Sequence, residues 1–317
     1  MKVTEHLELA KSKGKQLFSC EIVPPNRGRS IGEIIQSVEV LQPFEPAWID
    51  VTSHSSVTYF RENDDGTIHK KTFRKRPGTL GICGVIQNRF RIDTVAHILC
   101  MGFSKEETED AIIELNFLGI HNVLALRGDA PAISKPSRAD RTAHEYASDL
   151  VQQIVDMRQG RFLEDLEGSQ PLDFCVGVAG YPEKHFEAPS LKIDIQNLKK
   201  KVDAGADYIM TQMFFDNQKF FQFEKACRAA GITVPIIPGL KLLKSVGQLK
   251  SLPKAFHIDL PDELVDEVME NPSHALEIGK KWALKQSMEL LNAGVPGLHF
   301  YVLNDAPQIA DVVRKLR

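Results

Sequence analysis

Short runs of apolar, β-branched and aromatic residues alternate along this chain with stretches of helical periodicity. Eight of these runs predict strands, at Leu17–Val23, Trp48–Thr52, Thr94–Cys100, Asn122–Leu126, Phe174–Ala179, Tyr208–Gln212, Val234–Pro238 and Gly297–Leu303. Several are almost continuously apolar, as expected of strands that are covered on both faces. Strands that alternate with helices favour βα units and a parallel sheet.

The helical stretches begin and end at residues that commonly mark helix termini. Ser104 and Glu107 form a capping box, and Gly119 stands where a left-handed glycine would end that helix. Ser190 and Asp216 are expected to cap two later helices. Eight strands with helices between them predict a closed (β/α)8 TIM barrel.

The alternative α/β fold is an open Rossmann or flavodoxin-like sheet. Such a sheet needs fewer strands and usually carries a glycine-rich turn after the first strand, where this chain has Pro24-Pro25. We therefore expect residues 1–317 to form one catalytic barrel domain, with an extra N-terminal helix and no regulatory domain.

Two segments depart from a regular barrel. Residues 55–80 form a polar insertion after the second strand, and we expect a mobile excursion there. A solvated loop without a role and an active-site lid are equally weighted interpretations of it. Residues 262–293 predict two successive helices that pack outside the barrel before the last strand.

Composition narrows the class of protein. Hydrophobic residues make up 43% of the chain, enough to fill a barrel and coat its helices, and the net charge of −3 offers no general attraction to nucleic acid or to an anionic membrane. The five cysteines are scattered and odd in number, which indicates reduced thiols. No apolar run approaches the ~20 residues that span a bilayer. We expect a cytoplasmic protein that acts on small molecules.

Polar residues recur at one end of the predicted strands. The polar residues concerned are Glu21, Thr52, His97, Arg127-Gly128-Asp129, Tyr181-Pro182-Glu183-Lys184-His185, Gln212 and Asn304. In a (β/α)8 barrel the carboxyl ends of the strands and their loops build the catalytic face. The pattern therefore predicts an active site at that face.

Each of these residues also has a purely structural interpretation. Glu21 could pair with a buried cation, or it could be a general acid whose pKa is raised by its apolar strand. His97 alone is more often a hydrogen-bonded core histidine than a catalyst, and Lys199–Lys201 alone would more often be a solvated helix face.

The sequence argues against a metal centre or a serine nucleophile. His97 and Cys100 are three residues apart on a predicted strand, so their side chains point to opposite faces. The chain has no C-x-x-C pair, no H-E-x-x-H helix and no nucleophile elbow. The remaining groups can protonate and orient a substrate, so an organic cofactor would have to carry redox chemistry.

Taken together, the motifs of this chain resemble the methylenetetrahydrofolate reductase family in its short bacterial form. The segments that carry the resemblance cover nearly the whole chain in family order: Phe18–Pro25, Ala125–Asp129, Tyr146–Leu150, Tyr181–His185, Lys201–Ala206, Thr211–Asp216, Ile236–Gly239 and His299–Asn304. The resemblance implies a flavin-dependent barrel that reduces 5,10-methylenetetrahydrofolate to 5-methyltetrahydrofolate, with FAD as cofactor and NADH or NADPH as co-substrate.

The resemblance also assigns roles to residues. Glu21 would protonate N10 as the imidazolidine ring opens, and the resulting 5-iminium cation would accept hydride from N5 of reduced FAD. Asp129 would lie by the flavin and pterin as a second catalytic and substrate-binding residue, and Gln212 would contact the substrates. The positions that match FAD contacts are Thr52, His97, Arg127, Gly128, Asp129, Tyr146, Ala147, Tyr181, His185, Asp194 and Lys201. A site shared by nicotinamide and folate predicts ping-pong kinetics.

Several positions depart from the family pattern. Ile22-Val23 replaces a usual pair of phenylalanines, Ser53 stands where relatives commonly have an aromatic residue, and Pro77–Arg91 is longer than in the shortest relatives. Asp305 stands where many relatives carry an arginine that contacts folate. An acidic residue cannot replace that contact, so the mode of binding of the outer part of folate stays open.

Two other functions remain as alternatives. One is a methyltransferase barrel that uses methyltetrahydrofolate without flavin, and the other is a non-catalytic folate- or flavin-binding protein. The choice between NADH and NADPH is also open. Because family members are usually oligomeric, we expect a homo-oligomer.

Overall fold

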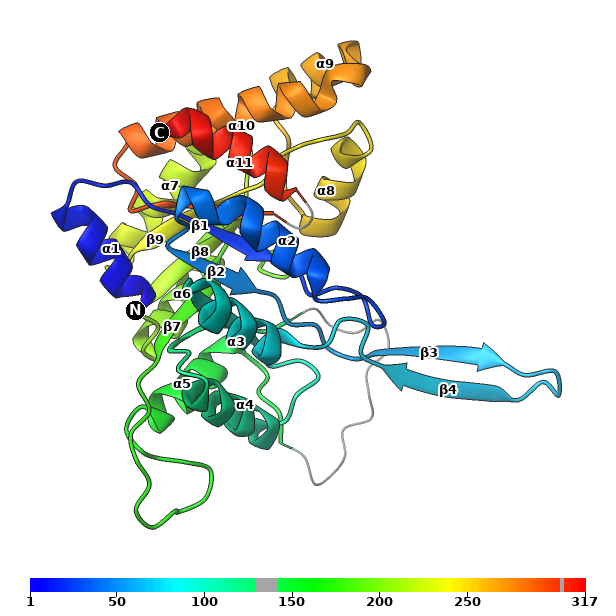
Figure 1. Cartoon of the computed structure of the whole chain (residues 1–317), viewed down its shortest axis with the longest axis vertical. Coiled ribbons are helices and arrows are strands. Elements are labelled where there is room, and N and C mark those ends of the chain that lie inside the picture. The colour runs from blue at the N-terminus through cyan, green and yellow to red at the C-terminus, as the bar shows by residue number, and fades with distance from the viewer. Residues whose placement is uncertain (129–141, 303–304) are drawn as a thin grey trace.

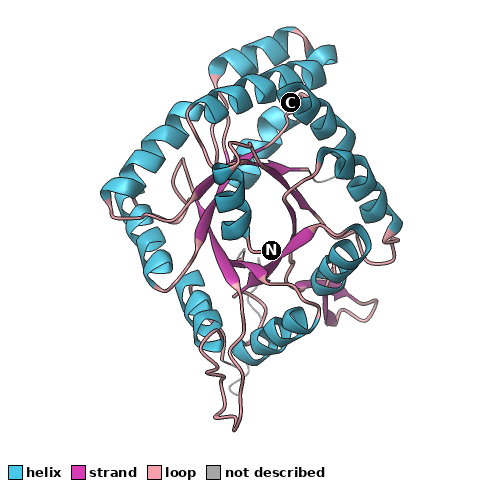
Figure 2. Ribbon diagram, turned by 60° about the vertical axis from the view of Figure 1, so that its left-hand side comes forward, coloured by secondary structure: helices cyan, strands magenta, loops and turns pink. Residues whose placement is uncertain are grey.

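The structure is a computed structural model that describes residues 1–128, 142–302 and 305–317. Eight parallel strands close into a barrel in the order β1-β10-β9-β8-β7-β6-β5-β2 (Figure 2). Their bounds are β1 (Phe18–Ile22), β2 (Trp48–Val51), β5 (Asp93–Leu99), β6 (Asn122–Leu126), β7 (Cys175–Gly180), β8 (Tyr208–Met213), β9 (Ile236–Leu240) and β10 (Leu298–Tyr301). Each predicted strand overlaps one of these, so the predicted (β/α)8 barrel is confirmed.

Every barrel strand is followed by a helix that packs on the outside of the barrel (Figures 1 and 2). The helices are α1 (Val3–Ser12), α2 (Gly32–Leu41), α3 (Thr79–Phe90), α4 (Lys105–Phe117), α5 (Ala147–Met157), α6 (Leu191–Asp203), α7 (Asn217–Ala229), α8 (Gln248–Phe256), α9 (Asp262–Glu270), α10 (Ala275–Asn292) and α11 (Ala306–Leu316). The pair α9 and α10 confirms the two helices predicted before the last strand.

The extra N-terminal helix α1 covers the amino-terminal mouth of the barrel (Figure 2). Val3 and Leu7 of this helix are buried against apolar side chains of the strands, including Trp48 and Tyr208. The backbone N–H of Val3 donates to Oδ1 of Asn122 at the start of β6, over 2.8 Å. This end of the barrel is therefore apolar and plugged, which leaves the opposite end for polar side chains.

The alternation of side chains along each strand decides which residues enter the barrel. Cys20 and Ile22 of β1 pack outward in the large core beneath the helices, together with Ile49 and Val51 of β2. The residues between them, such as Glu21, therefore point to the interior. The sequence pattern thus places its charged strand residues inside the barrel, away from the helices.

The predicted polar insertion after β2 forms a β-hairpin, a form that the sequence analysis did not specify. Strands β3 (Val57–Glu62) and β4 (Ile68–Phe73) pair antiparallel around a turn that contains Gly66, whose φ is +78°. The hairpin projects from the barrel as an exposed arm (Figure 1). Cross-strand packing of Tyr59 and Phe73, with ring centroids 5.4 Å apart, supports it. A lid role for this hairpin stays a prediction.

The predicted helix termini are confirmed. Ser104 and Glu107 form a reciprocal capping box with distances of 3.1 and 2.8 Å, and Gly119 adopts φ of +71° after α4. Ser190 and Asp216 accept hydrogen bonds from backbone N–H groups at the starts of α6 and α7. All five cysteines lie in the described part of the chain, buried and free, as expected of reduced thiols.

Close packing of α10 against the loop after β9 depends on a glycine. A Cβ atom added at Gly279 would lie 1.8 Å from the carbonyl oxygen of Leu243, which is backbone and cannot move aside without shifting the chain. We expect Gly279→Ala to lower the free energy of unfolding by at least about 1–3 kcal/mol, the usual cost of overpacking. Chemical denaturation monitored by far-UV circular dichroism measures the change.

Gly81 of α3 provides the matched control, because it is also helical and a Cβ atom there would meet no atom within 4 Å. Gly81→Ala should be neutral or stabilise by up to about 1 kcal/mol through the lower entropy of the unfolded chain. Equal effects of the two substitutions would contradict the packing argument.

Candidate active site

The centre of the site is a line of three titratable side chains inside the barrel. His97 of β5 places its Nε2 atom 3.3 Å from Oδ2 of Asp50 on β2 and 3.7 Å from Oε2 of Glu21 on β1. The side chains of Asp50 and His97 are 0% and 4% exposed, and that of Glu21 is 13% exposed. Glu21 is thus the member of the line that faces solvent and ligands.

Burial and charge together set the acidity of Glu21. Desolvation raises its pKa to about 7, against the lowering effect of the nearby His97. For His97, desolvation lowers the pKa, but the hydrogen bond to Asp50 and the charges of Glu21 and Asp50 outweigh it, and the net pKa is raised. The site therefore holds a carboxyl group that can carry a proton near neutral pH beside an imidazole that favours the charged form.

A neutral histidine lies on the other side of Asp50. Nδ1 of His299 on β10 is 3.8 Å from Oδ1 of Asp50 and 2.8 Å from the hydroxyl of Ser19 on β1. Burial lowers the pKa of His299 to about 4, so this ring is uncharged at neutral pH. Of His97 and His299, only His97 therefore supplies positive charge to the interior.

A second group of charges lies between the ends of β9 and β10. Asp305, at the start of α11, is buried and pairs with Lys241 at 3.0 Å and with Lys244 at 2.5 Å. Nζ of Lys241 also donates to the carbonyl oxygen of Tyr301 over 2.8 Å. Asp305 is thus held by two lysines, and the half-exposed Lys244 is the cation of this group that reaches the surface.

Most of the residues that match FAD contacts gather over β6 and β7. Arg127 follows β6, forms an ion pair with Glu187 and lies with its guanidinium 6.0 Å from the ring centroid of Tyr146. After β7, the rings of Tyr181 and His185 meet edge to face at 4.7 Å. The predicted positions on these elements therefore converge on one polar rim.

Helix α6 supplies the other two residues of this rim. Asp194 is buried and accepts the backbone N–H of His185 over 2.9 Å. Lys201 donates to the carbonyl oxygen of Ala179 on β7 over 2.6 Å, and burial lowers its pKa to about 8. Lys201 is therefore a partly buried cation at the strand end, rather than part of the solvated helix face that its sequence alone favoured.

The remaining predicted residues take positions around the same mouth. Thr52 follows β2 directly, and its buried hydroxyl has no hydrogen-bond partner among the described residues. Gly128 adopts φ of +82° beside Arg127, and Ala147 is the first residue of α5. The side-chain oxygen of Gln212 on β8 accepts the backbone N–H of Met213 over 2.9 Å, so its amide NH2 is the group available to a ligand.

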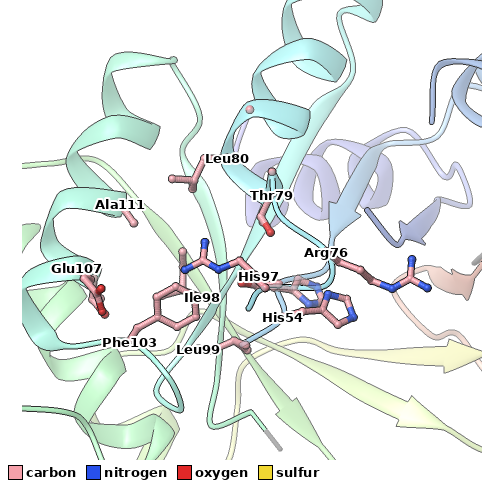
Figure 3. Close-up of a pocket in the computed structure, with 15 residues that line it drawn as sticks. His54, Arg76, Thr79, Leu80, His97, Ile98, Leu99, Phe103, Glu107 and Ala111 are labelled. Carbon is pink, nitrogen blue, oxygen red and sulfur yellow. The ribbon is translucent and has the colours of Figure 1, made fainter. Parts of the chain in front are cut away.

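A cavity of about 170 Å³ adjoins the site between β5 and α3. It is lined by His97 together with Ser53, Arg74, Arg76, Thr79 and Phe103 among others (Figure 3). The guanidinium of Arg74 lies 4.9 Å from the ring centroid of Phe103. The base of the β3–β4 hairpin therefore contributes cationic side chains to the wall of this cavity.

The structure describes most of the site residues predicted from the sequence, but not all of them. Asp129 and Asn304 lie outside the described residues, so the predicted pairing of Glu21 and Asp129 across a ligand stays a prediction. Sequence reasoning missed Asp50 and Lys241. Both could have been found, because Asp50 is a charge inside an apolar strand and Lys241 directly follows β9, the one strand to which no polar group was assigned.

A closed barrel with a buried acid, a histidine and a cationic rim at the carboxyl ends of its strands defines a (β/α)8-barrel enzyme. The family model described as methylenetetrahydrofolate reductase matches residues 2–317. The chain belongs to the methylenetetrahydrofolate reductase family, as its motifs predicted.

Individual relatives agree with this assignment. The 5,10-methylenetetrahydrofolate reductase of Salmonella typhimurium is 30% identical, and the match covers 94% of this chain and 90% of the relative. Methylenetetrahydrofolate reductase 1 of Schizosaccharomyces pombe is 29% identical over 100% of this chain but only 48% of the relative. The chain spans about half the length of the eukaryotic relatives it matches.

A solved structure provides a comparison of fold. It is described as an uncharacterized protein from Clostridium thermocellum that binds two copies of 5-methyl-5,6,7,8-tetrahydrofolic acid. Its TM-score is 0.59 at 13% sequence identity, and the match covers 98% of both chains. At this identity the likeness shows the barrel fold alone.

The described residues hold neither a cluster of metal-ligating side chains nor a candidate membrane span. Within 1–128, 142–302 and 305–317, no group of three or more histidine, cysteine and carboxylate side chains is arranged around a possible metal ion. Over the same ranges, no helix combines the length and the apolar character needed to cross a membrane.

The raised pKa of Glu21 has a consequence for stability. A carboxyl group whose pKa is higher in the folded chain binds its proton more tightly there, so the free energy of unfolding falls as the pH rises from about 4.5 to about 7. Above that range the folded protein bears the full cost of the buried charge. We expect Glu21→Gln to stabilise the protein by up to about 3 kcal/mol at pH 8.5 and by little at pH 4.5. Urea titrations at both values measure this, and a pH-independent effect would contradict it.

The charges around Asp305 make a separate prediction. Asp305→Ala would leave Lys241, whose side chain is fully buried, without its carboxylate partner, at a cost of about 3–5 kcal/mol. Lys244→Ala is the control, because Lys244 is 41% exposed and its loss leaves the buried pair intact, at about 0–1 kcal/mol. Thermal and urea unfolding compare the two variants. Similar losses in both would show that Asp305 does not serve to hold Lys241.

Proposed function

We propose that this protein reduces 5,10-methylenetetrahydrofolate to 5-methyltetrahydrofolate with NAD(P)H, by ping-pong hydride transfer through bound FAD. Membership of the reductase family supports the reaction class. The observation that carries the proposal is Glu21, a nearly buried carboxyl group at the catalytic end of the barrel whose pKa is raised to about 7. A general acid works best when its pKa lies near the working pH.

Glu21 acts as the proton donor in this proposal. Opening of the imidazolidine ring of the substrate requires a proton at N10, and a carboxyl group that keeps its proton near neutral pH can deliver it. The resulting positive charge on the substrate would be stabilised by a nearby anion in a site of reduced dielectric. Asp129 is the proposed anion, and Gln212 is proposed to bind the substrates through its amide.

The residues present fit a flavin dinucleotide. Its pyrophosphate needs cations, and Arg127 and Lys201 supply them at adjacent strand ends. The buried Thr52 hydroxyl and Arg127 Nε have no hydrogen-bond partner among the described residues, so both are available to a ligand. When bound, FAD would supply the hydride chemistry that no side chain of this site can perform.

The residues proposed to hold FAD are the positions that match FAD contacts in the family. It consists of Thr52, His97, Arg127, Gly128, Asp129, Tyr146, Ala147, Tyr181, His185, Asp194 and Lys201. The side chains among them bind and orient the cofactor, and Gly128, in the left-handed region, lets the backbone turn close to it. Folate and nicotinamide would then occupy the same face of the flavin in turn, which gives ping-pong kinetics.

Separate measurement of the two half-reactions by stopped flow tests this proposal. Wild-type protein reconstituted with FAD should turn yellow, and NADH and NADPH are each tried as reductant. Glu21→Gln should leave flavin reduction within a few fold but slow the oxidation of reduced enzyme by methylenetetrahydrofolate by about 10²-fold or more, because only that step needs the proton.

Asp93→Asn is the matched control. Asp93 is also a partly buried carboxylate, but it pairs with His6 at 2.8 Å at the start of β5, the amino-terminal end of that strand, so both half-reactions should stay unchanged. Equal losses in both half-reactions of Glu21→Gln would show that Glu21 is structural or binds cofactor. A protein that stays colourless with added FAD would favour the flavin-free methyltransferase instead.

A further inference from the structure

Asp50 is a buried carboxylate to which the proposed reaction assigns no part. Its side chain is 0% exposed, and it lies in β2 opposite Glu21 in the register of β1 and β2. Only Oδ2 has a hydrogen-bond partner, namely His97, while Oδ1 has none among the described residues. Removing a charged carboxylate from water costs free energy unless another interaction compensates for the lost hydration. His97 provides that interaction for Asp50.

We propose that Asp50 is a positioning residue for proton transfer by Glu21, because it keeps His97 as an imidazolium whose Nε2–H lies between the two carboxyl groups. The proposal rests on the proposed function for its role in catalysis, although its electrostatic content can be measured without turnover. Nε2 lies within 3.3 Å of Asp50 and 3.7 Å of Glu21, so one N–H group faces both carboxyl groups.

In this arrangement, burial and neighbouring charges act in opposite directions on the pKa values of His97 and Glu21. Burial by itself favours the neutral form of His97, and the carboxylate of Asp50 reverses that preference. The resulting cation lies beside Glu21 and opposes the effect of burial, which would otherwise raise the pKa of Glu21 further. Asp50 also repels Glu21 directly, but its effect on the pKa of Glu21 is smaller than that of His97.

The other groups that face Glu21 do not replace His97. Lys241, after β9, is a second cation that lowers the pKa of Glu21, but its effect is the smallest of the four that act on this group, and Lys241 is engaged with Asp305. From β10, burial keeps His299 neutral and raises the pKa of Tyr301 well above its usual value. The charge of His97, maintained by Asp50, is therefore the main one that limits how tightly Glu21 holds its proton.

Loss of Asp50 should consequently make Glu21 a weaker acid. In Asp50→Asn the volume is kept, but the ring of His97 loses its anionic partner and becomes neutral. Glu21 then keeps its proton to a higher pH. An opposite charge within a few ångströms typically moves a carboxyl pKa by 1–3 units, and the simultaneous loss of repulsion by Asp50 offsets part of this, which leaves an upward shift of about one unit.

Infrared difference titration of the flavin-loaded, full-length protein measures this directly. The carboxyl C=O band of Glu21 is isolated by subtraction of the spectrum of Glu21→Gln, and its midpoint is followed with pH. We expect the midpoint to rise by about one unit in Asp50→Asn. The ionisation seen in the pH profile of the folate half-reaction should move in the same direction by the same amount. An unchanged or lowered midpoint would overturn the proposal.

Further variants separate this role from a merely structural one. His97→Gln should raise the midpoint by at least as much as Asp50→Asn, because it removes the same positive charge but keeps the repulsion by Asp50. The double variant should show no shift beyond that of Asp50→Asn, because both substitutions act through the charge of His97. Ser19→Ala is the control: it removes the buried hydroxyl that pairs with His299 and leaves the carboxylate of Asp50 in place, so the midpoint should not move. A shift in Ser19→Ala equal to that in Asp50→Asn would indicate general disturbance of the interior.

Failure of this proposal can be told apart from failure of a variant to fold and from failure of the proposed function. If Asp50→Asn does not fold, Asp50→Ser and His97→Gln carry the same test, and absence of a shift in both would overturn the proposal. If the Glu21 midpoint shifts as expected but wild-type protein reduces no folate, the electrostatic role of Asp50 stands and the proposed reaction fails.

Discussion

Closure of the barrel by pairing of β1 with β10 on one side and with β2 on the other is the constraint on which the structure depends. Closure gives the strands an inside and an outside, and their alternation sends every second side chain inward. Helix α1 covers the amino-terminal mouth with apolar side chains such as Val3 and Leu7, so the charged groups inside the barrel gather toward the other mouth. The candidate active site is thus the part of the interior that the apolar core does not fill.

Within that space, charges are tolerated because each has a partner of opposite charge on another element of the barrel. Asp50 and Glu21 face one histidine from two adjacent strands, and Asp305 holds Lys241 where β9 and β10 end. These pairs are costly to bury but well defined in geometry, which is what a site needs to hold a proton at a fixed position. The rim above them, formed by residues such as Arg127 and Lys201, is more exposed and suits an anionic ligand.

Local sequence patterns are sufficient to predict some parts of this structure but not others. The strands, the caps at Ser104 and Ser190 and the polar groups at the strand ends follow from patterns within a few residues, and the structure reproduces them. The insertion at residues 55–80 was predicted only as a polar excursion, because its polar composition hid the short strands β3 and β4 of a hairpin. Lys201 likewise looked like a solvated lysine, since nothing local reveals that its side chain turns toward Ala179.

Hydrophobic periodicity and the order of motifs are properties of the linear chain, so they were sufficient to predict a (β/α)8 barrel of the methylenetetrahydrofolate reductase family. The contact of His97 with Asp50, 47 residues away, and the pairing of Asp305 with two lysines are visible only in the folded chain. Those contacts depend on the register of strands around a closed barrel, where a shift of one residue would turn each side chain to the opposite face.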